Sequence, residues 1–143
     1  AAACVMFTAA FKAALRIASR SLISVANAEE GELLNCALIG LRNLAEGNDD
    51  LKKEMVGHGV VALITKRLTH KTAKLHTLKL LIPLTVGASR TSLAHPDLIA
   101  QLLPLLAMPR SAPARSLHHS AFTAVHGIST FPEGRDALVR AGA

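Results

Sequence analysis

Residues 43–59 read NLAEGNDDLKKEMVGHG, and this stretch indicates what kind of fold the chain has. A small apolar helix end is followed by a polar joint, then by a short charged helix, and then by glycines. The pattern predicts a tight helix–turn–helix. A turn of this kind occurs in compact helical bundles, but it also occurs once per unit in repetitive helical folds.

The same unit recurs along the sequence. Three segments place apolar residues on one helical face, at spacings of three and four. These residues are Leu34, Ala37, Leu38, Leu41 and Ala45 in the first segment, Leu75, Leu78 and Ile82 in the second, and Leu117, Ala121, Val125 and Ile128 in the third. Each segment follows a polar or proline-marked break, at 27–32, 69–72 and 108–115. A period of about forty residues is typical of helical solenoids.

Composition supports an all-α fold. Half of the 143 residues are hydrophobic, yet only four are aromatic and all four are phenylalanines. A core of Ala, Leu, Val and Ile suits closely packed helices better than a sheet. We expect long and medium helices at 10–25, 31–46, 60–69, 72–86, 98–107 and 113–130, with short ones at 50–56, 90–94 and 133–140. Pro83 should bend or end its helix, because proline lacks a backbone donor.

The quoted stretch, extended to NLAEGNDDLKKEMVGHGVVALI, resembles the junction of armadillo repeats. FPEGRDALVRAGA (131–143) is similar to the same junction, and TVGASRTSLAHPDLIAQLLPLL (85–106) is similar in a looser way. The resemblance implies a right-handed α-solenoid of three-helix repeats. It divides the chain into a partial repeat (1–47), two repeats (48–88 and 89–131) and the start of another (132–143). Because the chain begins AAACVM, we expect it to be a fragment of a longer protein.

The first 28 residues carry no acidic residue and are amphipathic, as mitochondrial presequences are. We favour an ordinary helix whose buried stripe is Phe7, Phe11, Leu15, Ala18 and Leu22, with Lys12, Arg16 and Arg20 exposed beside it. The two cysteines, Cys4 and Cys36, lie in apolar helical patterns, so we expect reduced core residues of an intracellular protein.

The sequence offers little for catalysis. It has no phosphate-binding glycine loop, no G-x-S-x-G elbow and no H-E-x-x-H motif. Most acidic residues lie at expected helix starts, where they favourably meet the helix dipole. His119 and His126 could share a helix face, but no Cys or carboxylate at ligand spacing joins them. We therefore expect a non-enzymatic protein with no metal and no cofactor. No apolar run is long enough to span a membrane.

Positive charge is concentrated in the middle of the chain. Residues 55–132 hold one acidic residue, Asp97, against eight Lys and Arg. The densest run, KRLTHKTAKLHTLK (66–79), supplies a predicted basic ridge of Lys66, Arg67, Lys71, Lys74 and Lys79. This ridge either keeps a leucine-rich solenoid soluble or docks an acidic protein surface or an extended acidic peptide. Nucleic acid fits less well, because no aromatic residues are interleaved for base stacking.

The armadillo resemblance also implies a peptide-binding groove along the third helix of each repeat. In nuclear-import adapters of that family, this helix carries a Trp and, one turn later, an Asn. The Trp position falls here on Ile39, Lys79 and Thr123, and the Asn position on Asn43, Pro83 and Gly127. Only Asn43 matches, which argues against a nuclear-import receptor. Asn43 also has a simpler interpretation, as a helix-end residue bonding local backbone.

The function expected from these features is a protein-interaction scaffold or adaptor. The unit lengths and the EGRDAL phrase are similar to armadillo subunits of ciliary axonemes, such as a radial-spoke subunit. The expected location is therefore the cytoplasm, and within it the cytoskeleton or cilium. The alternative is a cargo- or peptide-recognition domain of a transport or regulatory protein.

Overall fold

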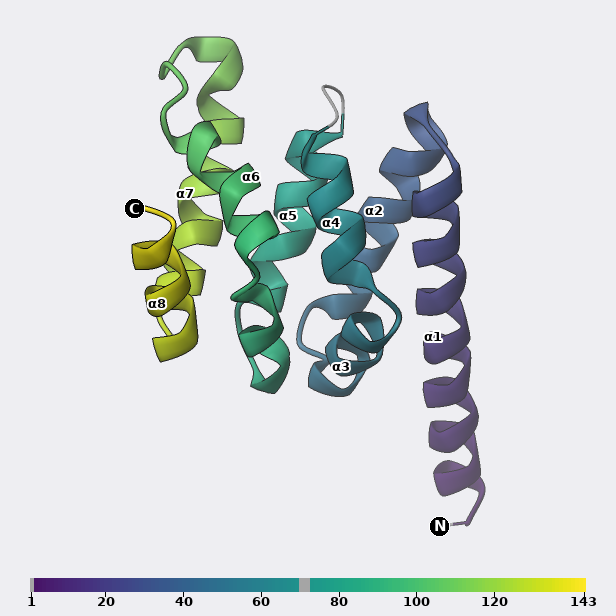
Figure 1. Cartoon of the computed structure of the whole chain (residues 1–143). Helices are drawn as coiled ribbons and strands as arrows, with labels where there is room; N and C mark the ends of the chain where they lie inside the picture. Colours follow the sequence, from purple (N-terminus) through teal and green to yellow (C-terminus); the bar gives the residue numbers. More distant parts are fainter. Residues whose placement is uncertain (1, 70–72) are drawn as a thin grey trace.

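The computed structural model describes residues 2–69 and 73–143, apart from the side chains of residues 2–5 and Phe7. This part of the chain is helical throughout and contains no strand. Figure 1 shows the elements in order: α1 (Ala2–Ala28), α2 (Gly31–Ala45), α3 (Asp49–Gly57), α4 (Val60–Leu68), α5 (Lys74–Leu84), η1 (Ala88–Leu93), α6 (Pro96–Leu106), η2 (Ala112–Ala114), α7 (Arg115–Ser129) and α8 (Pro132–Arg140).

The junction at 43–59 forms as its sequence predicts. The Asn48 side chain caps α3 by accepting a 3.0 Å hydrogen bond from the backbone N–H of Leu51. Gly47 and Gly59, with φ of 69° and 86°, provide the left-handed turns before α3 and before α4. Such φ values are costly for residues with a Cβ, so glycine at these two points permits the tight path from α2 to α4.

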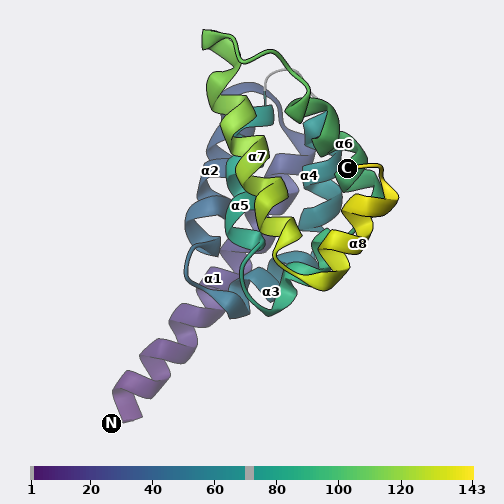
Figure 2. The ribbon, with the colours of Figure 1, turned by 90° about the vertical axis from the view of Figure 1, so that its left-hand side faces the viewer.

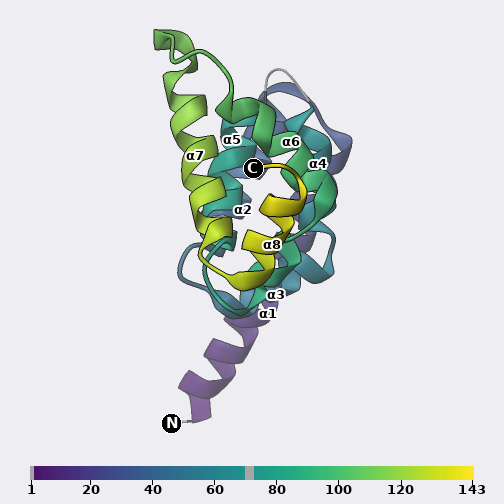
Figure 3. The same ribbon diagram turned by 60° about the vertical axis from the view of Figure 1, so that its left-hand side comes forward.

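Helices from successive units pack against one another in three columns. In the first column, the long helix α2 contacts α5, and α5 contacts α7. In the second column, which lies alongside the first, α1 contacts α4, and α4 contacts α6 (Figure 1). The short elements α3, η1 and α8 make the third column, at one end of the other two. Seen from the side in Figures 2 and 3, the long helices lie on one flank and α4 and α6 on the other.

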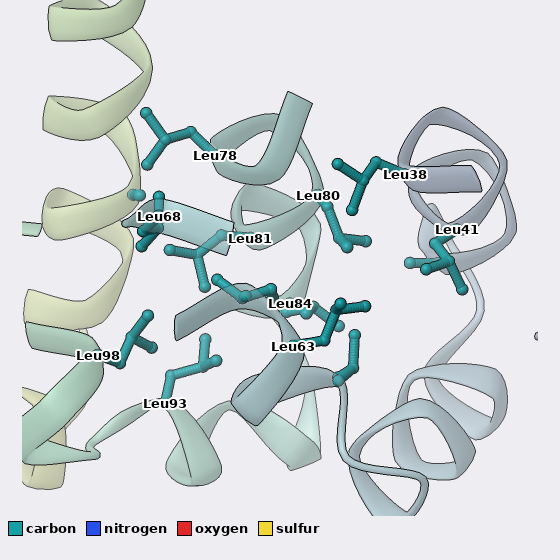
Figure 4. Close-up of a cluster of buried hydrophobic side chains, with 14 of the residues drawn as sticks. Leu38, Leu41, Leu63, Leu68, Leu78, Leu80, Leu81, Leu84, Leu93 and Leu98 are labelled. Carbon is teal, nitrogen blue, oxygen red and sulfur yellow. The ribbon is translucent and has the colours of Figure 1, made fainter. Parts of the chain in front are cut away.

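Leucine side chains fill the space between the columns. Figure 4 shows Leu41 of α2, Leu63 of α4, Leu81 of α5, Leu93 of η1 and Leu98 of α6 within one buried cluster. Each of these five leucines has almost no exposed surface. The cluster is shared by α2, α4, α5, η1 and α6 and is not enclosed by any one pair of these elements.

The predicted stripe on the first helix is wrong at its N-terminal end. Phe11 is 54% exposed, and among the side chains of α1 that the structure describes, those of Ser19, Ile23 and Ala26 are buried. The N-terminal end of α1 projects beyond α2, α3 and α4 (Figure 2), so burial along α1 increases only towards its C-terminal half. The side chains of Phe7 and Cys4 lie outside the described part. The other predicted stripe residues, Leu15, Ala18 and Leu22, are half-buried, while Lys12, Arg16 and Arg20 are exposed as predicted.

Other local expectations had mixed outcomes. The α5 helix ends at Leu84, one residue after Pro83. This end was predicted because proline has no backbone N–H to donate within the helix. The short helix expected at 90–94 is a 3₁₀ helix at Ala88–Leu93. Cys36 is not a core residue, because it lies on the exposed side of α2 as a free thiol. The α2 helix lies between α1 and α5 and turns one face towards the core, and the neighbouring positions Ala37 and Leu38 occupy that face.

Candidate partner-binding surface

The α2–α5–α7 layer has one side on the core and the other side open. In α2, Leu38 and Leu41 are fully buried, whereas Ile39 is 39% exposed and Asn43 is exposed. Lys79 of α5 is half-buried, because α5 has a neighbouring long helix on each side. The aliphatic stem of lysine tolerates such partial cover while its ammonium stays in water.

Burial shows which positions of the long helices are equivalent. Each of the three long helices has a set of four buried residues, and the spacing within the set is the same in all three. The sets are Ala37, Leu38, Leu41 and Ala45 for α2, Thr77, Leu78, Leu81 and Thr85 for α5 and its C-cap, and Ser120, Ala121, Ala124 and Ile128 for α7. For α2 and α7, the N-cap residue of the next helix also lies at a constant distance along the chain. Asn48 of α3 comes three residues after Ala45, and Phe131 of α8 comes three residues after Ile128. The residue equivalent to Ile39 and Lys79 is therefore Phe122, which is 58% exposed.

This register corrects the sequence-based choice of Thr123. Thr123 is half-buried, and its hydroxyl donates a 2.9 Å hydrogen bond to the carbonyl oxygen of His119 within α7. The residue equivalent to Asn43 is His126 rather than Gly127. The Asn43 amide makes no side-chain hydrogen bond to any described residue, so the structure gives no support to its interpretation as a residue bonding local backbone. It is available on the open face.

Arg67 does not belong to an exposed ridge. Its side chain is completely buried, and its guanidinium donates to the carbonyl oxygens of Ala26 and Glu29, at 2.6–2.9 Å and 2.9 Å. A further bond of 2.6 Å reaches the Glu30 carboxylate. The physical reason is that the last carbonyls of a helix have no partners within it. Arg67, on α4, satisfies the end of α1 and so joins the two helices.

The rest of the predicted basic ridge is divided between two helices. Lys66 is exposed on α4, with its ammonium 3.1 Å from the carbonyl oxygen of Asn27. Lys74 and Lys79 are half-buried on α5, and Lys71 lies outside the described residues. Of these cations, Lys79 is the one whose helix position matches Ile39 and Phe122. Of the predicted site residues, Ile39, Asn43 and Lys79 lie on α2 and α5, whereas Lys66 and Arg67 lie on α4.

A basic cavity lies where the α6–α7 connection meets the first turns of α7. It has a volume of about 430 Å³ and is lined by Arg110, Arg115, His118, His119 and Phe122. The connection is the loop that rises highest above α7 in Figure 1. In the sequence, Arg110 and Arg115 belong only to the proline-marked break at 108–115. Their convergence with Phe122 depends on the path of the loop, which the sequence pattern does not specify.

Within residues 2–69 and 73–143, no group of three or more His, Cys, Asp or Glu is arranged to hold a metal ion. His119 and His126 have no third ligand there. In the same part of the chain, no helix combines the length and the apolarity needed to cross a bilayer. No protein-family model matches the sequence, and comparison with curated proteins gives no significant match. The function is therefore argued from the geometry of this surface.

Proposed function

We propose that this chain is a non-enzymatic protein-interaction scaffold, built as a right-handed α-solenoid of armadillo-like three-helix repeats. Three recurring columns of helices and the junction at 43–59 support the repeat architecture. We place the scaffold in the cytoplasm, within a large cytoskeletal or axonemal assembly such as a radial spoke, on the similarity of its EGRDAL phrase to armadillo subunits there. Its partners are other proteins.

One observation carries the proposal. Ile39, Lys79 and Phe122 occupy equivalent positions on three adjacent long helices, and all three keep side-chain surface in contact with solvent. Aromatic residues are enriched at protein interfaces, so the exposed Phe122 supports a binding surface, to which Ile39 adds apolar area and Lys79 a positive charge. These three residues with Asn43 define the long-helix face, which is the surface proposed to bind the partner.

The test is a charge-inserting variant of the long-helix face. The triple variant Ile39→Glu, Lys79→Glu, Phe122→Glu, expressed as a tagged chain in cells, should be lost from the native complex while its circular dichroism spectrum stays helical. A matched triple variant places glutamates on exposed residues of the other columns, at Ala62, Ala100 and Val139. It should remain in the complex. Retention of the first variant at normal stoichiometry would refute the assignment of this face.

The basic cavity favours a second candidate, a peptide- or cargo-recognition domain of a transport or regulatory protein. A scaffold keeps its partners in a stable assembly, whereas a recognition domain binds an extended acidic peptide reversibly. Titration of the purified chain with such a peptide separates the two functions. Saturable binding that competes with the native partner favours recognition, and stable incorporation without competition favours the scaffold.

A further inference from the structure

We infer that the cavity between the α6–α7 connection and α7 is a binding site for the phosphorylated side chain of a partner protein. The inference rests on the proposed function, because the cavity adjoins the long-helix face through Phe122, which lines it. It specifies the partner's chemistry: a segment lying on that face would place a phosphate between Arg110 and Arg115.

The charges in the cavity are not balanced by the protein. Arg110 and Arg115 are both exposed, and neither side chain makes an ion pair or hydrogen bond with any residue in the described ranges. Among the described residues, those that line the cavity are two arginines, two histidines and one phenylalanine, and none carries a carboxylate. Cationic side chains held near one another repel, and an anion between them relieves that repulsion.

The local backbone limits where these two arginines can be. Pro109 precedes Arg110, and Pro113 lies in η2, two residues before Arg115. Proline fixes φ and so reduces the conformations open to the loop. The His118 ring is held by a 3.2 Å hydrogen bond from Nε2 to the carbonyl oxygen of Leu106, which ties α7 to the end of α6. A site with fewer conformations loses less entropy when a ligand binds.

A phosphate fits this lining better than a carboxylate does. A phosphate monoester carries close to two negative charges at neutral pH and three acceptor oxygens, so it can engage both arginines at once. One guanidinium can take two phosphate oxygens with parallel hydrogen bonds and still leave a third oxygen for the second arginine, whereas a carboxylate has only two oxygens. Phe122, 58% exposed, offers an apolar wall for the carbon stem of the phosphorylated residue. A volume of about 430 Å³ leaves room for both parts.

The experiment uses phenyl phosphate as the probe and follows backbone amide signals of the isotope-labelled 143-residue chain by NMR. We expect saturable shifts concentrated in residues 110–122, and binding of benzoate at least about tenfold weaker. Arg110→Gln with Arg115→Gln should weaken phenyl phosphate binding at least about tenfold. The matched control, Arg135→Gln with Arg140→Gln on the exposed surface of α8, should bind as the parent chain does.

A second measurement connects the cavity to the partner. Phosphatase treatment of the native complex and the Arg110/Arg115 double variant should each reduce partner retention, and the α8 control should not. Absence of saturable shifts, equal binding of benzoate, or equal loss in both double variants would overturn the inference. If the phosphate probe fails while the long-helix face variant still loses its partner, only this inference fails. If the probe binds but the face variant keeps its partner, the proposed function fails instead.

Discussion

Replacing the buried Arg67 by methionine should destabilise the fold severely. Methionine keeps much of the side-chain volume but removes five hydrogen bonds to the end of α1 and the turn after it, at Ala26, Asn27, Glu29 and Glu30. Breaking a buried charge pair costs about 3–5 kcal/mol. The Glu30 side chain is 59% exposed and stays hydrated after the change, so we expect a loss of about 2–4 kcal/mol.

Urea unfolding followed by circular dichroism measures this loss, and amide exchange locates it. The bond from Glu29 N–H to the carbonyl oxygen of Val25 should lose protection first, because it closes the last turn of α1. The neighbouring Lys66→Met is the control. It removes one exposed contact, at 3.1 Å, and should cost less than about 1 kcal/mol. Equal unfolding midpoints for the two variants would refute the role given to Arg67.

Two further predictions concern packing. Leu41→Ala should cost about 2–5 kcal/mol because Leu41 is fully buried, whereas Ile39→Ala should cost clearly less in the same urea assay; equal losses would mean that the faces of α2 are misassigned. Gly127→Ala should cost about 1–3 kcal/mol, because a Cβ there would lie 2.4 Å from the hydroxyl oxygen of Thr85. The control is Gly57→Ala, because a Cβ at Gly57 would meet nothing within 4 Å. If the Gly127→Ala variant is as stable as this control, α7 does not approach Thr85 at the end of α5 as closely as the structure shows.

The sequence predicted those parts of the fold that depend on local pattern. The α2 stripe is correct at every position, because α2 buries a single face and a 3.6-residue period describes that face. The junction at 43–59 is correct because Asn48, Gly47 and Gly59 have strong local preferences for caps and turns.

Helices with other surroundings were predicted less well. The α5 helix packs between α2 and α7, so Thr77 and Leu80 are buried while the predicted Leu75 and Ile82 are only half-buried. A single amphipathic stripe cannot describe a helix covered on several sides. Phe11 was placed in the core because it fits the period, but its side chain is 54% exposed in the N-terminal part of α1.

The candidate site depended on contacts distant in sequence. Arg67 lies in a basic run and was therefore assigned to the surface, yet it binds carbonyl oxygens 38–41 residues away. Phe122 was missed because the α7 register cannot be set from the α7 sequence alone. Burial at Ala121 and Ala124, with the N-cap at Phe131, was needed to set it. Ile39 and Asn43 are exposed and Lys79 is half-buried, and that they bind a partner stays a prediction.

The most direct test of the central claim is hydroxyl-radical footprinting of the chain, alone and in its native assembly. This method reports the solvent exposure of individual side chains. Our account predicts that Phe122 and Ile39, 58% and 39% exposed in the chain by itself, become protected in the assembly. Val139, 71% exposed on α8, should stay as reactive as before. If Phe122 and Ile39 are as reactive in the assembly as in the isolated chain, the long-helix face is not where the partner binds.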